Sequence, residues 1–134
     1  MSEILPGLIG FAAYFAASIA ICVLFGAVYL SLTPHREFDL IVNQHNASAA
    51  VALGGGVLGY AIALSAAVRE THSAPAFLLW AFVALLAQVL ATWLARLAHP
   101  GLSKAIEANA LASAIWLASV SVAVGILNAA CMSP

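Results

Sequence analysis

The stretch that decides the fold runs from Ala47 to Val68 and reads ASAAVALGGGVLGYAIALSAAV. It carries no charged residue and is followed directly by Arg69-Glu70. It is long enough to cross the hydrocarbon core of a bilayer as an α-helix, which takes about 20 apolar residues. A strand of a membrane barrel would instead be about 10 residues long and would alternate apolar and polar positions. The stretch therefore predicts a transmembrane helix.

Three further stretches have the same character, so four spans are expected, at about residues 8–32, 47–68, 76–97 and 108–132. Of the 134 residues, 65% are hydrophobic and 7% are charged, and the mean hydropathy is +1.09. A soluble domain carries about 25% charged residues. The composition excludes a soluble globular protein and a disordered tail, and the net charge of −1 offers no surface for nucleic acid. We expect an all-α polytopic membrane protein with a single transmembrane domain over residues 1–134.

Two short amphipathic segments precede the second and fourth spans. Arg36–Asn46 reads REFDLIVNQHN, and Leu102–Asn109 is comparable; both are expected to be short helices at the membrane interface. A shift of the chain by 64 positions brings His35 onto His99 and the first pair of spans onto the second. This pattern predicts two helical hairpins in the same orientation, related as a parallel repeat.

The second span contains an unusual run of glycines, Gly54, Gly55 and Gly56, with Gly59 following. Each glycine costs a helix about 1 kcal/mol relative to alanine, so the run needs a reason. One interpretation is close packing against another helix, since Gly55 and Gly59 form a GxxxG step. The other is local unwinding that would turn backbone carbonyls toward an ion.

Two amides lie inside spans, Gln88 near the centre of the third and Asn128 near the end of the fourth. An amide in hydrocarbon needs a partner, so each side chain faces another helix or a wet cavity. No span has Asp, Glu, Lys, Arg or His near its middle, which argues against proton-coupled transport. A passive channel lined by amides, hydroxyls and carbonyls stays compatible with the sequence.

Polar side chains are concentrated on the segment before the second span. We identify a candidate interaction surface there, composed of His35, Arg36, Glu37, Asp39, Asn43 and Asn46. His35, Glu37, Asp39 and His45 on this segment can form a solvated loop face, a pH-sensitive or partner-docking surface, or a metal site, but their spacing matches no zinc motif. The chain also has no nucleophile elbow and no phosphate-binding loop. We therefore expect no metal, no cofactor and no enzymatic activity.

A resemblance to a known family rests on residues along most of the chain. They are Thr33-Pro34 with Glu37, Leu40-Ile41, Asn46-Ala47, Ala49-Ala50 with Leu53-Gly54-Gly55 and Gly59, Trp80 with Ala84-Leu85 and Gln88, and the ending GILNAACM at Gly125–Met132. With these motifs the chain resembles the YjfL-like bacterial inner-membrane proteins, the domain of unknown function 350. One departure is His45, where the family often has glycine. The resemblance implies a multi-pass protein of the bacterial inner membrane whose function is not known.

Loop charges predict the orientation in that membrane. Arg36, Arg96 and Lys104 lie on one side, and Arg69 lies on the other. Because Lys and Arg are enriched in cytoplasmic loops, the side with three basic residues is expected to be cytoplasmic. Both termini would then be periplasmic.

Two functions remain open from the sequence. In the first, a homo-oligomer packed through the small-residue faces of the second and fourth spans forms a passive channel or a permease for a small solute or ion. Its lining would be Gln88, Asn128 and the glycine segment. In the second, the protein is a non-transporting membrane component that supports envelope integrity and anchors a cytoplasmic protein through residues 34–46. In both, the lipid bilayer is the surrounding partner.

Overall fold

The computed structural model describes residues 2–32 and 37–132, and within these ranges every regular element is an α-helix. Four helices are long and apolar enough to cross a membrane: α1 (Ile4–Leu32), α3 (Ala47–Glu70), α4 (Ala74–Ala98) and α6 (Leu111–Cys131). Two short helices, α2 (Glu37–Val42) and α5 (Leu102–Glu107), precede α3 and α6. The predicted all-helical class with four transmembrane helices is confirmed. A long, short, long order of helices occurs twice along the chain, while the parallel repeat stays a prediction.

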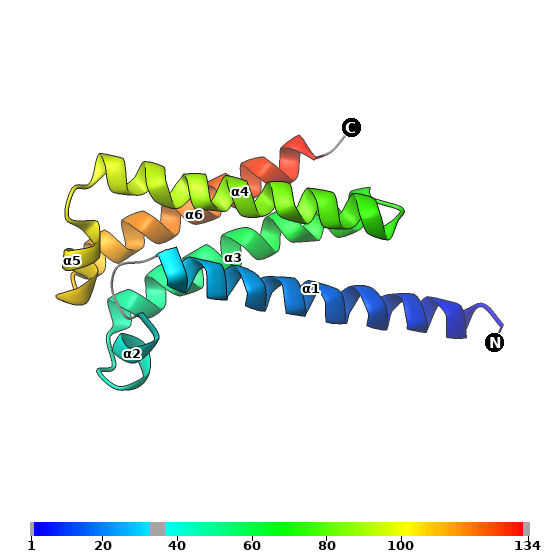
Figure 1. Cartoon of the computed structure of the whole chain (residues 1–134), viewed down its shortest axis with the longest axis horizontal. Helices are drawn as coiled ribbons and strands as arrows, with labels where there is room; N and C mark the ends of the chain where they lie inside the picture. The colour runs from blue at the N-terminus through cyan, green and yellow to red at the C-terminus, as the bar shows by residue number, and fades with distance from the viewer. Residues whose placement is uncertain (1, 33–36, 133–134) are drawn as a thin grey trace.

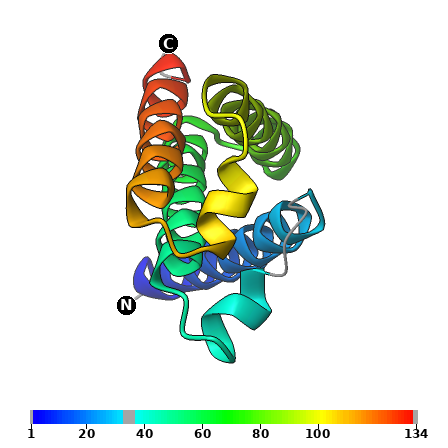
Figure 2. The same ribbon diagram turned by 90° about the vertical axis from the view of Figure 1, so that its left-hand side faces the viewer.

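The long helices lie lengthwise beside one another (Figure 1). The short helices α2 and α5 lie at one end of this bundle, and the start of α1 and the end of α6 lie at the other. Helix α3 is central, because it contacts α1, α4 and α6. Seen from the end that carries α2 and α5, α6 lies directly against α3, and α1 lies on another side of α3 (Figure 2). Helices α3 and α6 run in the same direction from the short-helix end.

Polar side chains define where the spans begin. The Asn46 side chain accepts a hydrogen bond from the backbone N–H of Ala49 at 3.0 Å and so caps α3. The Ser73 hydroxyl accepts one from the backbone N–H of Ala76 at 3.3 Å and caps α4. Such caps satisfy N–H groups that have no partner within the helix, which is most valuable where water is scarce.

Residues with a left-handed backbone conformation turn the chain into α3 and α6. His45 has φ 52° directly before the cap of α3, and Asn109 has φ 61° before α6. The fourth span was expected from about residue 108, but α6 begins at Leu111 because the turn at Asn109 separates it from α5. A glycine would adopt this φ without strain, whereas His45 adopts it at some energetic cost.

The packing places small residues inside and large apolar residues outside. Alanines such as Ala52, Ala63 and Ala84 are fully buried, whereas Leu58, Leu79 and Leu127 are exposed on the outer surface. This distribution suits a protein surrounded by lipid, because lipid tails are as apolar as leucine and helices associate through close contact of small residues. A few aromatic side chains, including Phe25, Tyr60 and Phe77, complete the interior.

Candidate functional site

The glycine run of the second span is helical along its whole length, since α3 is continuous from Ala47 to Glu70. The unwinding interpretation is therefore not what the structure shows. Three of its glycines face neighbours: Gly55 meets Ala118 of α6, Gly56 meets Tyr29 of α1, and Gly59 meets the backbone at Ser121 of α6. Gly54 instead faces open space on the outer surface.

The contact between α3 and α6 is made by backbone as much as by side chains. A Cβ atom on Gly125 of α6 would overlap the carbonyl oxygen of Gly59. A Cβ atom on Gly59 would in turn overlap the carbonyl oxygen of Ser121. The two helices therefore meet with no space for a solute between them, and the glycine segment serves packing at this contact.

This contact also bears on the expected oligomer. The small-residue faces of the second and fourth spans, which were expected to join separate copies, are packed on each other within one chain. A homo-oligomer remains a prediction, but it would have to use other surfaces. A contact between copies through α1 and α4 would be formed by the large apolar side chains exposed on these helices.

Gln88 of α4 is the most deeply buried amide of the membrane interior, with 1% of its surface exposed. Its Nε2 donates a hydrogen bond to the carbonyl oxygen of Ser121 at 3.3 Å. This bond fixes the orientation of the amide, because the carbonyl of Ser121 can only accept. Its Oε1 is buried and has no hydrogen-bond partner. The side chain thus makes one hydrogen bond from α4 to α6 and leaves a buried acceptor without a partner.

A cavity of about 210 Å³ lies beside Gln88, between α1 and α4. We call it the mid-membrane cavity; its lining residues are Phe25, Tyr29, Gln88, Val89, Thr92, Trp93 and Arg96. Gln88, Thr92 and Arg96 are spaced four residues apart, so they follow one face of α4 toward the short-helix end. The cavity is large enough for several water molecules, each of which takes about 30 Å³ in the liquid.

Arg96 lies at the end of this cavity and also lines a second hollow. That hollow, which we call the loop-side pocket, has a volume of about 670 Å³ and is lined by Arg96, His99, Gly101, Leu102, Ser103, Lys104 and Glu107. The Nε of Arg96 is buried and has no hydrogen-bond partner. The side chain of Arg96 therefore lies between the loop-side pocket at the short-helix end and the mid-membrane cavity.

Asn128 does not join this arrangement. Its Nδ2 is buried without a hydrogen-bond partner, but Asn128 does not line the mid-membrane cavity. It follows Ser121, the partner of Gln88, by seven residues on α6, which is about 10 Å along a helix. The structure therefore does not bring together the two amides that the sequence suggested as one lining.

The predicted interaction surface divides into several parts. His35 and Arg36 lie outside the described residues, and Glu37 is described only as the first residue of α2. The Asp39 carboxylate accepts hydrogen bonds from Asn43 at 2.6 Å and from Gln44 at 3.3 Å on the surface.

Asn46 is not on that surface at all. It is 6% exposed, and its Nδ2 donates to the carbonyl oxygens of Ile106 at 3.0 Å and Glu107 at 3.2 Å. It thereby fastens the end of α5 to the start of α3. In the opposite direction, the side-chain oxygen of Asn109 accepts a hydrogen bond from the backbone N–H of Ser48 at 3.1 Å. Asn46 was predicted as exposed because its role as a cap between two loops depends on residues 60 positions away.

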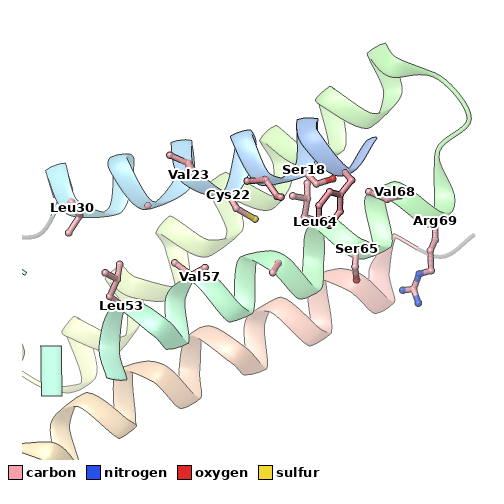
Figure 3. A pocket seen from close by; sticks show the side chains of 14 residues that line it. Ser18, Cys22, Val23, Leu30, Leu53, Val57, Leu64, Ser65, Val68 and Arg69 are labelled. Carbon is pink, nitrogen blue, oxygen red and sulfur yellow. The ribbon is translucent and has the colours of Figure 1, made fainter. Parts of the chain in front are cut away.

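A third hollow is an open groove of about 780 Å³ between α1 and α3. Figure 3 shows Cys22 and Leu30 of α1 projecting toward α3, and Leu53 and Val57 of α3 projecting toward α1. Its walls are mainly apolar, so it suits lipid rather than a polar solute.

Sequence reasoning missed four residues that shape the site: Tyr29, Thr92, Arg96 and Gly125. Thr92 and Arg96 could have been found from their spacing, since they stand four and eight residues after Gln88. Tyr29 had the appearance of an interfacial aromatic, and Gly125 could be assigned only once α6 was known to pack on α3. Among the described residues, no group of three or more His, Cys, Asp or Glu side chains is close enough to hold a metal.

Comparisons with known proteins place the chain among membrane proteins without an assigned activity. Residues 3–132 match the family model described as Domain of Unknown Function (DUF350). The UPF0719 inner membrane protein YjfL of Escherichia coli strain K12 is 38% identical over 131 residues, which covers 98% of each chain. The protein of the same name in Escherichia coli O157:H7 matches equally. No solved structure matches.

Proposed function

The chain belongs to the DUF350 family of inner membrane proteins, and from that premise we propose that it is a passive permease for a small polar solute, whose path runs between α1 and α4. The observation that carries the proposal is the unused acceptor Gln88 Oε1, buried beside a cavity in the middle of the spans. A buried amide oxygen without a partner costs free energy, and water or a solute in the cavity would remove that cost.

The entrance to the path is the loop-side pocket. A solute would enter there, pass the side chain of Arg96 and reach Gln88 in the mid-membrane cavity. On the loop-charge argument, this entrance faces the cytoplasm and both termini face the periplasm. Transport would be passive, because the described residues that line the mid-membrane cavity contribute amide, hydroxyl, indole and guanidinium groups and no carboxylate or imidazole to relay protons.

Within one chain, the mid-membrane cavity does not extend beyond Gln88 on α4. A continuous path therefore needs α1 to move away from the bundle or a second copy to complete the wall. Helix α1 is suited to either, since only 6% of its most apolar 18-residue stretch is buried against the rest of the protein. We retain the homo-oligomer as part of the proposal, with α1 and α4 as its contact surfaces.

The proposal is tested by solute flux into liposomes that contain the purified protein. Swelling is followed by light scattering with potassium chloride, potassium acetate and glycerol outside, and empty liposomes give the background. Gln88→Leu keeps the volume but removes the amide, and we expect it to abolish flux. Leu90→Ala, a change on the exposed face of α4, is the matched control and should leave flux unchanged. Equal flux through Gln88→Leu and the unchanged protein would refute the path.

The alternative function, a non-transporting component that anchors a cytoplasmic protein through residues 34–46, has less support. Asn46 is internal, and the Asp39 carboxylate is already bonded to Asn43 and Gln44. If it holds, Glu37→Ala combined with Asp39→Ala would lose a partner in co-purification, while Gln88→Leu would alter only stability.

A further inference from the structure

The side chains along the proposed path carry mainly positive charge. Arg96 and Lys104 are cationic, whereas Glu107 is the one acidic side chain among the described residues that line the loop-side pocket. Among its described lining residues, the mid-membrane cavity has Arg96 and no acidic side chain. A low-dielectric wall around such a cavity strengthens the field of a single charge, so we expect a positive potential inside it.

Arg96 is the residue at which this charge matters most, because one donor of its guanidinium has no hydrogen-bond partner. The Nε atom is buried without a hydrogen-bond partner at the junction of the two hollows. A donor that is buried without a hydrogen-bond partner is costly, even on a side chain that is otherwise half-exposed. Gln88 supplies a second unsatisfied atom at the other end of the cavity, and it is an acceptor. The junction therefore has an unpartnered donor on a cationic side chain, and the far end has an unpartnered acceptor.

Resting on the proposed function, we infer that the solute is a small soluble anion that binds at Arg96. The anion accepts hydrogen bonds from the guanidinium, as carboxylates and other oxyanions commonly do. Gln88 Oε1 accepts a hydrogen bond from the anion's own hydroxyl or from a water molecule that enters with it. The volume of about 210 Å³ limits the occupant to a small anion with a few waters.

The potential in the cavity can be measured with a thiol placed inside it. Thr92 lines the cavity, and Thr92→Cys is close to isosteric. The chain would first be freed of its two native cysteines by Cys22→Ala and Cys131→Ala. Three methanethiosulfonate reagents then differ only in charge: anionic sulfonatoethyl, cationic trimethylammonioethyl and neutral hydroxyethyl. Each rate is divided by the rate of the same reagent with a free thiol in solution.

We expect the anionic reagent to modify Thr92→Cys at least about tenfold faster than the cationic one, a ratio equivalent to about 1.4 kcal/mol. Arg96→Gln should remove this preference, and Arg96→Lys, which keeps the charge, should retain most of it. Leu90→Cys on the exposed face of α4 is the matched control and should react slowly with every reagent, since a thiol in lipid does not form a thiolate.

The outcomes separate this inference from the proposed function. If the neutral reagent modifies Thr92→Cys faster than Leu90→Cys but the charged pair react equally, the path stands and the anion is refuted. If no reagent reaches Thr92→Cys faster than Leu90→Cys, the path itself is refuted. Vesicles of phosphatidylcholine with and without phosphatidylglycerol are compared as well. A preference that disappears with phosphatidylglycerol would assign Arg96 to an anionic lipid headgroup and overturn the soluble anion.

Discussion

Helices α6 and α1 both lie against α3, yet they are attached to it in opposite ways. Helix α6 meets α3 backbone to backbone, through Gly59 and Gly125. Helix α1 meets the bundle mainly through aromatic side chains, of which Phe25 lies flat on Tyr60 with ring centroids 4.5 Å apart. Most of the remaining surface of α1 is exposed, and an apolar groove separates part of it from α3.

The difference shows which part of the molecule is scaffold and which part can open. In a membrane the force that joins helices is close van der Waals contact rather than exclusion of water, so the glycine contact fixes α3 and α6 together. Helix α1 has fewer such contacts and covers the mid-membrane cavity with Phe25 and Tyr29. We therefore expect substitutions to act strongly in the first region and selectively in the second.

The largest effect is expected from Gly125→Leu, which should break the α3–α6 contact. A side chain here would collide with the backbone of Gly59, and overpacking of this kind costs about 3 kcal/mol or more. Equilibrium unfolding in mixed detergent micelles, followed by circular dichroism, measures the loss. Gly54→Leu is the matched control, because Gly54 faces open space. If both variants were equally stable, the backbone contact would not hold the bundle together.

A smaller loss is expected from Phe25→Ala, which tests how α1 is attached. Phe25 is 2% exposed and stacked on Tyr60. Its removal should cost about 2 kcal/mol through lost packing, below the about 3–5 kcal/mol of a water-soluble core, because lipid is as apolar as the interior. Val23→Ala, at a residue 67% exposed on the same helix, should change stability by less than about 0.5 kcal/mol. Proteolysis of α1 in micelles gives a second readout, and equal cleavage in both variants would contradict an aromatic anchor.

Asn46→Ala should weaken the short-helix end, where the two halves of the chain are joined. The change removes the cap of α3 and two hydrogen bonds to the end of α5. A lost cap costs about 1 kcal/mol. The same unfolding experiment measures it, with Asn43→Ala on the exposed surface as the control. A cost no greater than that of Asn43→Ala would mean that Asn46 does not join the halves.

The smallest change in stability is expected from Gln88→Leu, although it should remove transport. The variant loses one hydrogen bond to Ser121, worth about 0.6 kcal/mol between membrane helices, and also removes the unpaired Oε1. We expect a net change below about 1 kcal/mol in unfolding. A loss of several kcal/mol would mean that Gln88 serves as a structural tie, and the flux result would then carry no information on the path.

The sequence was sufficient for the helices and insufficient for their contacts. Long apolar stretches predicted the four spans, and the segments Arg36–Asn46 and Leu102–Asn109 predicted helices where α2 and α5 lie. The glycine run indicated a close contact, but the sequence could not show that the partner was α6 of the same chain. Lipid is as apolar as the interior, so hydrophobic periodicity does not reveal which face of a span is buried.

The same limit applied to the candidate site. Gln88 could be singled out because an amide in a span is unusual, and the structure confirms that it is buried. Its cavity is formed by residues of α1 more than 50 positions earlier, Phe25 and Tyr29, and this pairing of helices left no local signal. Arg96 at the end of a span was indistinguishable from an ordinary interfacial arginine until the two hollows on either side of it were known.

The central claim is that the path runs through the mid-membrane cavity, and blocking that cavity tests it most directly. Thr92→Trp places a large side chain inside the cavity, and Leu90→Trp places the same side chain on the exposed face of the same helix. Flux of acetate and chloride is measured in liposomes containing equal amounts of each variant. The account predicts that Thr92→Trp stops flux and that Leu90→Trp leaves it at the level of the unchanged protein. Equal flux through both variants would contradict it.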